Sequence, residues 1–576
     1  MIGINIGHHD SSVCHFLLES GEFKKLEIIL SERVGRRKNV GGFPFAALKY
    51  FRKVSPQQWA GLKDEDLVQN CFGEHPRITE AEVDGRVPDY GALLQGFRLH
   101  KASSLHNSKI GFTPHHLSHA YSIFPVMPFE RALIVVSDGA GSEKSAFSTA
   151  DLEWDFVEKN REEGREYFSV YAFENGKITP LEKFFSKQWF FTERKLRFSA
   201  SFGSHFEYTA KLIFNNWTQA GKVMGLSAYG KSIEIKDMRE YLLALNLEDF
   251  KIFKSKIEFD SQSEESFQRS ANVAASIQHH FEVGMLKRMK ELKEKYPQFD
   301  NVVLVGGCAL NGLFNMKLVQ SQLYKQVYVP PFPNDEGIAL GCATKLAFER
   351  GDLKFKVAPI ETINSYYGPI HNAVELHEDK VPSVFSQFIV EKCEDVIERA
   401  AGLIEKNQIV AWMQGRSEVG PRALGHRSIL CRPDIPDIKN HLNNFVKYRE
   451  KFRPYGGSVL KELTTEYFEV DDTFHSPFMT FCAQVRSHYR EKLAGVTHVD
   501  GTCRLQTLCE KQNPLYYNLI KKCHEKYGLG VVLNTSLNLM DQPIVETLED
   551  AKLFFENSKI KYIIIGSYLI RKNDEI

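Results

Sequence analysis

Residues 270–295 read SANVAASIQHHFEVGMLKRMKELKEK, and a short polar link joins them to Val302-Val303-Leu304-Val305. The first segment is rich in helix-forming residues, and its apolar residues recur with helical spacing. The second is a run of β-branched and aliphatic residues, which is typical of a buried strand. A helix that leads into a buried strand is a building unit of α/β folds, so this stretch predicts that class.

The same alternation extends in both directions. Over the first 350 residues we expect strands at Met1–Ile6, Leu26–Leu30, Ala132–Val136 and Asn301–Val305. Periodicity then weakens and prolines and glycines interrupt it, so we place a linker at 356–375 between a domain at 1–355 and a second α/β domain at 376–576. The second domain is expected to contain strands at 408–412, 530–533 and 562–565 and helices at 393–406 and 547–557.

Composition excludes several classes of protein. A chain of 576 residues suggests roughly two to four domains. Lys plus Arg and Asp plus Glu both number 73, so the net charge is +0, whereas a general nucleic-acid binder would carry excess positive charge. We therefore expect no nucleic-acid partner. The sequence has no membrane-length apolar run, no signal-peptide pattern and no CxxC pair among its ten cysteines, which predicts a cytoplasmic protein with reduced thiols and no membrane partner.

One histidine pair has the spacing of metal ligands. His115 and His119 lie four residues apart, on one face of a predicted helix. Asp138 and Asp335 lie in glycine-containing turns, where carboxylates often face metals or phosphates. Two histidines and two carboxylates are a plausible set for iron, manganese or zinc. The HExxH metalloprotease pattern is disfavoured because His116 stands where it requires glutamate, and the alternative is a pair of surface or hydrogen-bonded histidines.

Two further turns carry candidate residues. His9 and Asp10 follow the first strand, and a histidine beside an acidic residue at a strand end is a candidate general base; a simple polar turn is the alternative. Gly306-Gly307 and Asn311 follow the strand that ends at Val305, and a glycine turn into a helix can hold an anion on backbone N–H groups. Such a turn can equally serve packing alone.

Two basic runs in the second domain predict a site for an anion. The first is GRSEVGPRALGHRS at 415–428, and the second is KYREKFRP at 447–454. Arginine forks match phosphate and carboxylate geometry, and glycines allow an oxyanion to approach the backbone. A solvated charged face is the usual meaning of one basic run, but two neighbouring runs with glycines and aromatic residues favour a pocket for a highly anionic small molecule.

Taken together, these motifs resemble the NodU/CmcH family of O-carbamoyltransferases, which build carbamate esters on natural products. The resemblance spans nearly the whole chain, and its motifs occur in the family's order. Besides the two basic runs they are HHxxHA at 115–120, SDG at 137–139, GKVMGLSAYG at 221–230, GGCALN at 306–311, PNDEG at 333–337, HVDGTCRLQT at 498–507 and NTSLN at 534–538. The resemblance implies an actin-like N-terminal domain of the duplicated ribonuclease H type and a YrdC-like C-terminal domain.

The resemblance also implies a two-step reaction. The C-terminal domain is expected to make carbamoyl-AMP from carbamoyl phosphate and ATP with Mg²⁺, and the N-terminal domain to transfer the carbamoyl group to a hydroxyl of a small-molecule acceptor. Cations are needed to neutralise phosphate charge. The implied nucleotide and phosphate residues are Arg422, Arg427, Lys447, Arg449, Arg453, Arg504, Asn534 and Ser536 in the C-terminal domain, and Lys222, Gly306, Gly307 and Asn311 in the N-terminal domain.

In the N-terminal domain the resemblance implies Fe²⁺, or another divalent transition metal, on His115, His119, Asp138 and Asp335. It also implies His9 as the base with Asp10 beside it, while Lys447 and Arg449 act in the first step. The competing hypotheses are a tRNA threonylcarbamoyl-transfer enzyme, disfavoured by the net charge, and a nucleotide-binding regulator without catalysis. The acceptor and the oligomeric state, a homodimer included, cannot be read from the sequence.

Overall fold

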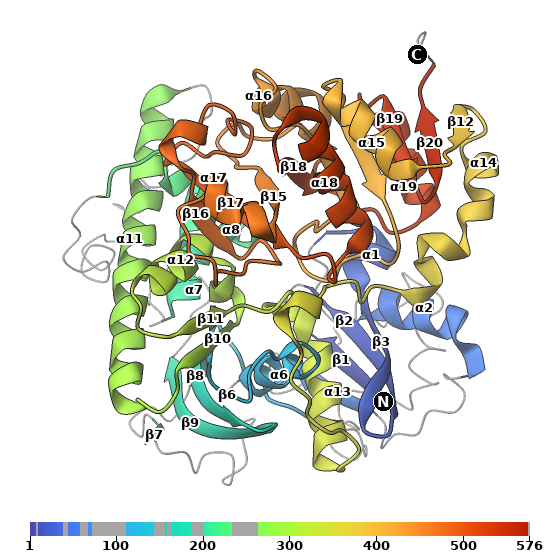
Figure 1. Ribbon diagram of the computed structural model, residues 1–576. Helices are drawn as coiled ribbons and strands as arrows, with labels where there is room; N and C mark the ends of the chain where they lie inside the picture. The colour runs from blue at the N-terminus through green and yellow to red at the C-terminus, as the bar shows by residue number, and fades with distance from the viewer. Residues whose placement is uncertain are drawn as a thin grey trace.

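The computed structural model describes residues 1–6, 10–38, 44–57, 67–71, 111–142, 156–157, 164–186, 201–232 and 263–573. These residues form a mixed α/β structure with three sheets, which confirms the α/β class predicted from the alternation of strands and helices (Figure 1). The two sheets built from the first 328 residues lie in the lower half of the view, and the third sheet, built from the later part of the chain, lies above them.

The first two sheets share one topology. Sheet one has the order β3-β2-β1-β4-β5, and five strands of sheet two have the order β9-β8-β6-β10-β11. In each, the first three strands are antiparallel neighbours and the last two continue parallel to the central strand. The bounds are β1 (Ile2–Ile6), β2 (Ser12–Glu19), β3 (Glu22–Leu30), β4 (Leu67–Cys71), β5 (Gly111–Phe112), β6 (Arg131–Ser137), β8 (Arg165–Glu174), β9 (Lys177–Ser186), β10 (Asn301–Val305) and β11 (Gln326–Tyr328), with β7 (Phe156–Val157) beside β9.

Two helices pack between these sheets. Helix α13 (Ile338–Glu349) lies against β1 and against α6 (His115–Ser122). A side chain at Gly341 would place its Cβ 1.7 Å from the carbonyl oxygen of Ser118, so only glycine permits α13 to approach α6 this closely. A Cβ at Gly3 would likewise lie 1.8 Å from the carbonyl oxygen of Ala339. These two contacts fix α6 at the centre of the N-terminal half.

Sheet three has the order β12-β20-β19-β13-β14-β18-β15-β17-β16. Its strands are β12 (Ile389–Lys392), β13 (Val410–Met413), β14 (Arg427–Cys431), β15 (Gly456–Leu460), β16 (Phe481–Gln484), β17 (Thr502–Leu508), β18 (Val531–Ser536), β19 (Tyr562–Ile565) and β20 (Tyr568–Arg571). The helices of this part are α14 (Val381–Val384), α15 (Val396–Glu405), α16 (Ile438–Leu442), α17 (Thr464–Tyr467), α18 (Pro514–Tyr527) and α19 (Leu548–Asn557). The strand expected at 562–565 is present with the predicted ends, and the other strands and helices expected in this half are present with ends that differ by at most three residues.

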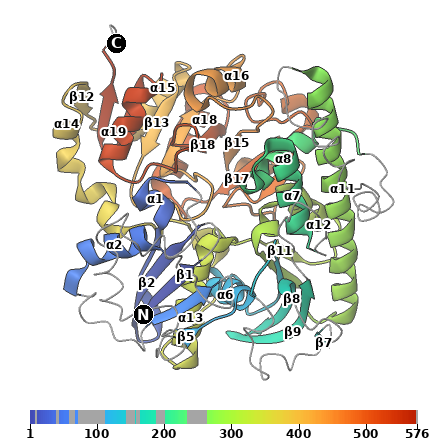
Figure 2. The same cartoon turned by 180° about the vertical axis from the view of Figure 1, so that it is seen from behind.

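The later part of the chain packs directly on the earlier part. Helix α11 (Glu264–Lys295) runs beside both halves, and α7 (Phe202–Phe214), α8 (Ala220–Ser227) and α12 (Gly312–Gln320) lie between it and sheet three (Figure 2). The Phe214 and Phe452 rings stack with centroids 6.1 Å apart, and Asn315 donates to the carbonyl oxygens of Ala309 and Thr480 at 2.8 Å each. Two more of the described α-helices, α1 (Ser31–Gly35) and α2 (Phe45–Val54), lie between β3 and β4 in the chain.

Across the described ranges, none of the helices combines the length and hydropathy that a membrane crossing requires.

Candidate active site

Four predicted metal ligands converge at the carboxyl ends of β6 and β10. His115 and His119 lie on successive turns of α6, and their Nε2 atoms are 3.1 and 3.2 Å from Oδ2 of Asp138. The same two nitrogens lie 3.4 and 3.7 Å from Oδ1 of Asp335. One ligand atom from each residue lies within 4.8 Å of the other three, and all four residues are buried. Burial excludes the alternative of surface histidines.

Electrostatics within this group favour a bound cation. Burial disfavours a charged imidazole, but the nearby carboxylates of Asp335 and Asp138 outweigh burial and raise the pKa of His115 to about 10. Burial disfavours the charged form of Asp138 too, but hydrogen bonds from His115 and His119 hold its pKa well below the usual value. Two imidazole nitrogens and two carboxylate oxygens are donors that first-row divalent metals accept, so the residues fit such an ion.

Glycines shape the turn that carries Asp138. Gly306 has φ +88°, and a Cβ there would lie 2.4 Å from the carbonyl oxygen of Ser137. The N–H groups of Gly139 and Gly307 donate to Oδ1 of Asp138 at 2.7 and 3.3 Å, which leaves Oδ2 directed at the histidines. Gly306 and Gly307 therefore lie beside the metal ligands, and their predicted contact with the nucleotide stays a prediction.

The start of the chain also reaches this group. Asn5 donates to the carbonyl oxygens of Asp10 at 3.1 Å and of Asp335 at 3.0 Å, and Asn334 donates to Oδ2 of Asp10 at 3.3 Å. Asp10 is thus placed next to the turn that carries a metal ligand. His9, the predicted base, lies outside the described residues, and its role stays a prediction.

Two predicted nucleotide residues have other partners. Asn311 caps α12 by accepting from the N–H of Phe314 at 3.0 Å, and it exchanges amide hydrogen bonds with Gln278 at 2.9 and 3.0 Å. Lys222 on α8 forms an ion pair with Glu450, and its ammonium lies 5.4 Å from the centroid of the Phe214 ring. These contacts suit helix capping and packing between the two halves, and the predicted nucleotide contacts stay predictions.

A second group of charged residues lies beside sheet three. We call it the cation cluster, and it comprises Arg422, Lys447, Arg449, Arg453 and Arg504. Burial and then Arg449 lower the pKa of Arg453 to about 10, and burial and then Arg504 lower the pKa of Arg422 well below its usual value. The pKa of Lys447 is also well below normal, because of burial and then Arg449 and Arg453. These cations repel one another and would be stabilised by a bound anion.

Hydrogen bonding supports the same conclusion. The buried Nε atoms of Arg422 and Arg504 have no hydrogen-bond partner among the residues that the structure describes. Asn534 donates from Nδ2 to Ala423 and Ser458 at 3.2 and 3.1 Å, while its buried Oδ1 has no described partner. A buried polar atom without a partner is costly, so these atoms mark a place for a ligand.

Other members hold the cluster in place. The Lys447 ammonium donates to Oγ of Ser536 at 3.2 Å and to Oδ1 of Asn538 at 2.7 Å, which joins the 447–454 segment to the end of β18. Arg449 stacks over the Tyr455 ring at 4.4 Å and donates from Nε to Oδ1 of Asn443 at 3.1 Å. Lys447 is the last residue of a short π-helical turn, η13 (Asn443–Lys447), a feature that is frequent at functional sites.

Comparison with known proteins supplies the family. Residues 91–344 match the model of the carbamoyltransferase N-terminus, and residues 401–572 match that of the carbamoyltransferase C-terminus. Nodulation protein NolNO of Sinorhizobium fredii is 31% identical over 94% of this chain and 76% of its own length. The chain belongs to the carbamoyltransferase family. The resemblance drawn from the motifs is therefore confirmed, and the protein is an enzyme of this family.

Further relatives of this carbamoyltransferase include nodulation protein NolO of Bradyrhizobium diazoefficiens, 29% identical over 80% of this chain and 78% of that protein. Nodulation protein U of Rhizobium tropici is 33% identical over 46% of this chain and 44% of its own length. A solved structure of full-length HypF, in its phosphate- and nucleotide-bound form, covers 61% of this chain and 56% of that chain, with 14% identity and a TM-score of 0.32. A similarity this low carries no argument about fold or ligand.

Within the carbamoyltransferase, Arg427 is surrounded differently from the cation cluster. Its side chain is fully buried and donates to the carbonyl oxygens of Gln414, Gly415 and Glu546. The buried Nε of Arg427 has no described partner, but carbonyl groups already accept from both terminal nitrogens of the guanidinium. This geometry favours a structural role, in which Arg427 closes the loop that presents Arg422. Its predicted contact with the nucleotide is untested, and we leave Arg427 out of the proposed anion site.

Sequence reasoning did not single out Lys38, which follows α1. Burial and then Arg453 and Lys222 lower the pKa of its ammonium, so Lys38 lies near the cation cluster although it comes from the start of the chain. The basic run Arg36-Arg37-Lys38 was the available signal. Nothing in that run indicates a contact with residues several hundred positions away.

The two groups of the carbamoyltransferase lie close together. The loop 415–428 packs on the turn that carries Asp335, because a Cβ at Gly420 would lie 2.5 Å from the carbonyl oxygen of Pro331 and 3.7 Å from Oε1 of Glu336. Glu336 is also one of the charges that act on Arg422. A residue next to a metal ligand therefore interacts with a member of the cation cluster.

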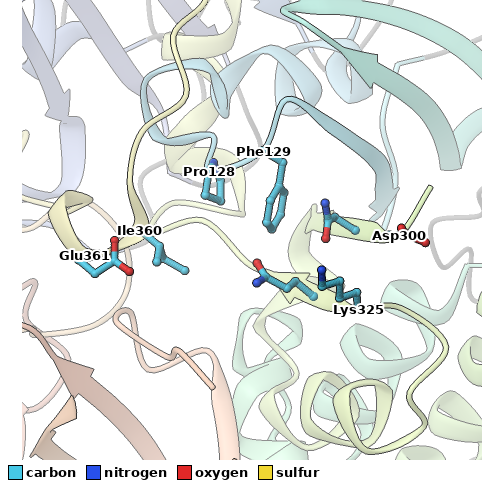
Figure 3. A pocket seen from close by; sticks show the side chains of 8 residues that line it. Pro128, Phe129, Asp300, Lys325, Ile360 and Glu361 are labelled. Carbon is cyan, nitrogen blue, oxygen red and sulfur yellow. The ribbon is translucent and has the colours of Figure 1, made fainter. Parts of the chain in front are cut away.

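A surface pocket of about 430 Å³ lies elsewhere (Figure 3). Asp300, Asn301, Lys325 and Gln326 line it, at the amino ends of β10 and β11, together with Pro128, Phe129, Ile360 and Glu361. Asp138 and Gly306 follow the carboxyl ends of β6 and β10, which are parallel strands. The pocket thus lies at the opposite edge of the sheet from the metal ligands, and we assign it no catalytic role.

Proposed function

We propose that this carbamoyltransferase is an ATP-dependent O-carbamoyltransferase that works in two steps at two adjacent sites. The observation that carries the proposal is the pairing of two chemically different groups. One is a recessed cation cluster in which two guanidinium Nε atoms have no described partner, and the other is a buried set of two histidines and two aspartates. The first suits polyphosphate chemistry and the second suits a metal-assisted transfer.

The first step takes place at the cation cluster. Carbamoyl phosphate loses inorganic phosphate to water and leaves carbamate, one oxygen of which attacks the α-phosphorus of ATP. Pyrophosphate departs with the electron pair of the broken P–O bond, and carbamoyl-AMP remains. Arg422, Arg453 and Arg504 offset the phosphate charges as they meet, Lys447 and Arg449 bind beside them, and Asn534 and Ser536 offer amide and hydroxyl groups. Mg²⁺ accompanies ATP.

The second step takes place at the histidine and aspartate group. An acceptor hydroxyl attacks the carbamoyl carbon, its proton passes to His9, and AMP leaves. Asp10, held by Asn334, orients His9. A divalent metal on His115, His119, Asp138 and Asp335, with Fe²⁺ our choice, would act as a Lewis acid toward the phosphate of the departing AMP. The N–H groups of Gly139 and Gly307 keep Oδ1 of Asp138 occupied so that Oδ2 stays directed at the histidines.

The domain assignment is part of the same proposal. The repeated strand order of sheets one and two supports an actin-like, duplicated ribonuclease H-type domain at 1–355. The mixed nine-stranded sheet and its cation cluster support a YrdC-like domain at 376–576, with 356–375 as the linker. The acceptor is a small molecule with a hydroxyl group. A net charge of +0 argues against a nucleic-acid acceptor, and we place the reaction in the cytoplasm without a membrane partner.

The test is to mix the purified chain with ATP, Mg²⁺ and carbamoyl phosphate, without an acceptor, and to measure carbamoyl-AMP by mass spectrometry. We expect carbamoyl-AMP and an equal amount of pyrophosphate. The control is Arg504→Met, which removes a cluster cation and should form neither. Folded protein that forms no carbamoyl-AMP would refute the first step.

A further inference from the structure

Helix α6, which carries His115 and His119, begins without a cap of its own. Its N-cap residue is Pro114, which has no side-chain group to accept from the first turn. The first N–H groups of any helix need partners, and in a buried helix water cannot supply them. Partners must therefore come from other parts of the chain.

Two distant side chains supply these partners. Oγ of Ser142 accepts from the N–H of His115 at 2.9 Å, and Oε1 of Glu166 accepts from the N–H of His116 at 2.9 Å. The same Oε1 accepts from the N–H of Ser142 at 3.1 Å. Glu166 thus holds both the helix and the second capping residue, and a carboxylate at a helix N-terminus is favoured by the helix dipole.

The carboxylate is itself fully buried. Oε2 of Glu166 forms an ion pair with Lys183 on β9, and both side chains have no exposed surface. Ser169, which pairs with Lys183 across β8 and β9, hydrogen bonds through Oγ to Nδ1 of His116 at 2.8 Å. Glu166 and Ser169 on β8 therefore contact the first turn of the helix that carries the histidines, and Lys183 on β9 holds Glu166.

A buried ion pair is a poor source of stability, because the loss of hydration offsets most of the attraction between the charges. Stability alone gives little reason for this pair in the core. Its geometry points to another role: the pair fixes the rotation and height of a short helix whose two imidazoles must meet Asp138 and Asp335.

We propose that Glu166 and Lys183 are positioning residues of the transfer site, which act on the metal ligands through the first turn of α6. This inference rests on the proposed function in one respect: both require that His115, His119, Asp138 and Asp335 bind a metal. Neither residue touches the substrate, and both act before the reaction by holding His115 and His119 in the geometry that the ion requires.

The experiment measures Co²⁺ binding to the full chain by competition with a chelator, together with the visible absorption of bound Co²⁺ and the melting temperature. The variants are Glu166→Gln, Lys183→Met and their combination. We expect each single variant to bind Co²⁺ about 10- to 100-fold more weakly and with an altered spectrum, the range typical of groups that orient metal ligands. The double variant should regain part of the affinity, because the amide oxygen still caps α6 and no lone charge is buried.

Met289→Ala is the control for a loss of stability alone, since Met289 is a fully buried residue of α11 and is neither a metal ligand nor a cap of α6. It should melt lower but bind Co²⁺ with wild-type affinity and spectrum. If the Glu166 and Lys183 variants fail to fold, Ser142→Ala replaces them. It removes one cap and should weaken Co²⁺ binding about fivefold.

Glu166 and Lys183 variants that bind Co²⁺ as the wild type does would overturn the positioning role and leave the proposed function intact. In the Ser142→Ala experiment, unchanged affinity would have the same meaning. Wild-type protein that binds no Co²⁺ would overturn both the positioning role and the metal-assisted transfer step.

Discussion

Two arginines five positions apart in one loop should respond in opposite ways to the same substitution. Arg422 lies in the cation cluster, and its buried Nε has no described hydrogen-bond partner. Arg427 is fully buried, and although its Nε likewise has no described partner, its terminal nitrogens donate to four backbone carbonyl groups, those of Gln414, Gly415, His426 and Glu546. We predict that Arg422→Met abolishes tight ATP binding without loss of stability, and that Arg427→Met destabilises the fold.

The magnitudes follow from these contacts. Arg427→Met leaves buried carbonyl oxygens without donors. Hydrogen bonds to charged groups contribute about 1.5–3 kcal/mol each to stability, and a single substitution seldom costs more than about 5 kcal/mol. We expect a loss of about 3–5 kcal/mol, which lowers the melting temperature by about 6–20 °C for a domain of this size. Nε of Arg422 has no described hydrogen bond to lose, and Arg422→Met removes the repulsion from Arg504 and Arg453. The free energy of unfolding of this variant should therefore differ from that of the wild type by less than about 1 kcal/mol.

The assay combines calorimetric melting of both variants with titration of ATP and of inorganic tripolyphosphate at fixed ionic strength. Loss of one charged hydrogen-bond donor predicts that Arg422→Met weakens both ligands about 10- to 150-fold. The reasoning would be refuted if Arg422→Met melted as low as Arg427→Met, or if it bound tripolyphosphate with wild-type affinity.

Two further predictions concern the metal ligands and the titration of the cluster. Gly307→Ala places a Cβ 3.0 Å from Oδ1 of Asp138, so we expect this variant to bind Co²⁺ more weakly than the wild type. The control is Gly402→Ala in α15, whose Cβ meets nothing within 4 Å and which should keep the wild-type Co²⁺ affinity. Equal affinity in the two variants would contradict the close packing at Gly307. Burial and then neighbouring cations lower the pKa of Lys447, and a bound anion would raise that pKa again. Tripolyphosphate binding at high pH therefore takes up a proton, and the affinity for tripolyphosphate should fall as pH rises through the lowered pKa. Titrations of tripolyphosphate from about pH 7 to about pH 10 would measure this fall in affinity, and Lys447→Arg should make the affinity less dependent on pH. An affinity that rises with pH would contradict the assignment of the titrating group to Lys447. The same pKa shift makes the unfolded chain bind more protons in that pH range, so the stability of the free protein should increase with pH there.

Local patterns were sufficient for much of the fold. The strand at Asn301–Val305 is present with the predicted ends, and the helix expected at 270–295 begins earlier, at Glu264, because Ser263 caps it by accepting from the N–H of Ser266. The i, i+4 spacing of His115 and His119 likewise required only helical geometry. Such features depend on residues close in sequence, and their spacing is visible in the chain itself.

Contacts between distant residues could not be read in this way. Arg427 and Arg422 have the same side chain and the same glycine-rich surroundings in the sequence, but only one is enclosed by the carbonyl groups of 414, 415 and 546. Lys38 approaches Arg453, and Glu166 meets Lys183 through the register of β8 and β9. Each role depends on which strands pair and how the two halves pack, which no local pattern specifies.

The central claim is that the chemistry is divided between two sites, and one comparison tests it most directly. Arg504→Met and His119→Ala would be given ATP, Mg²⁺ and carbamoyl phosphate, and the carbamoyl-AMP formed would be quantified by mass spectrometry against the wild type. We predict that His119→Ala has lost its bound metal but forms carbamoyl-AMP at the wild-type level, whereas Arg504→Met keeps its metal and forms none. Equal loss of carbamoyl-AMP in both folded variants would contradict the division into two sites.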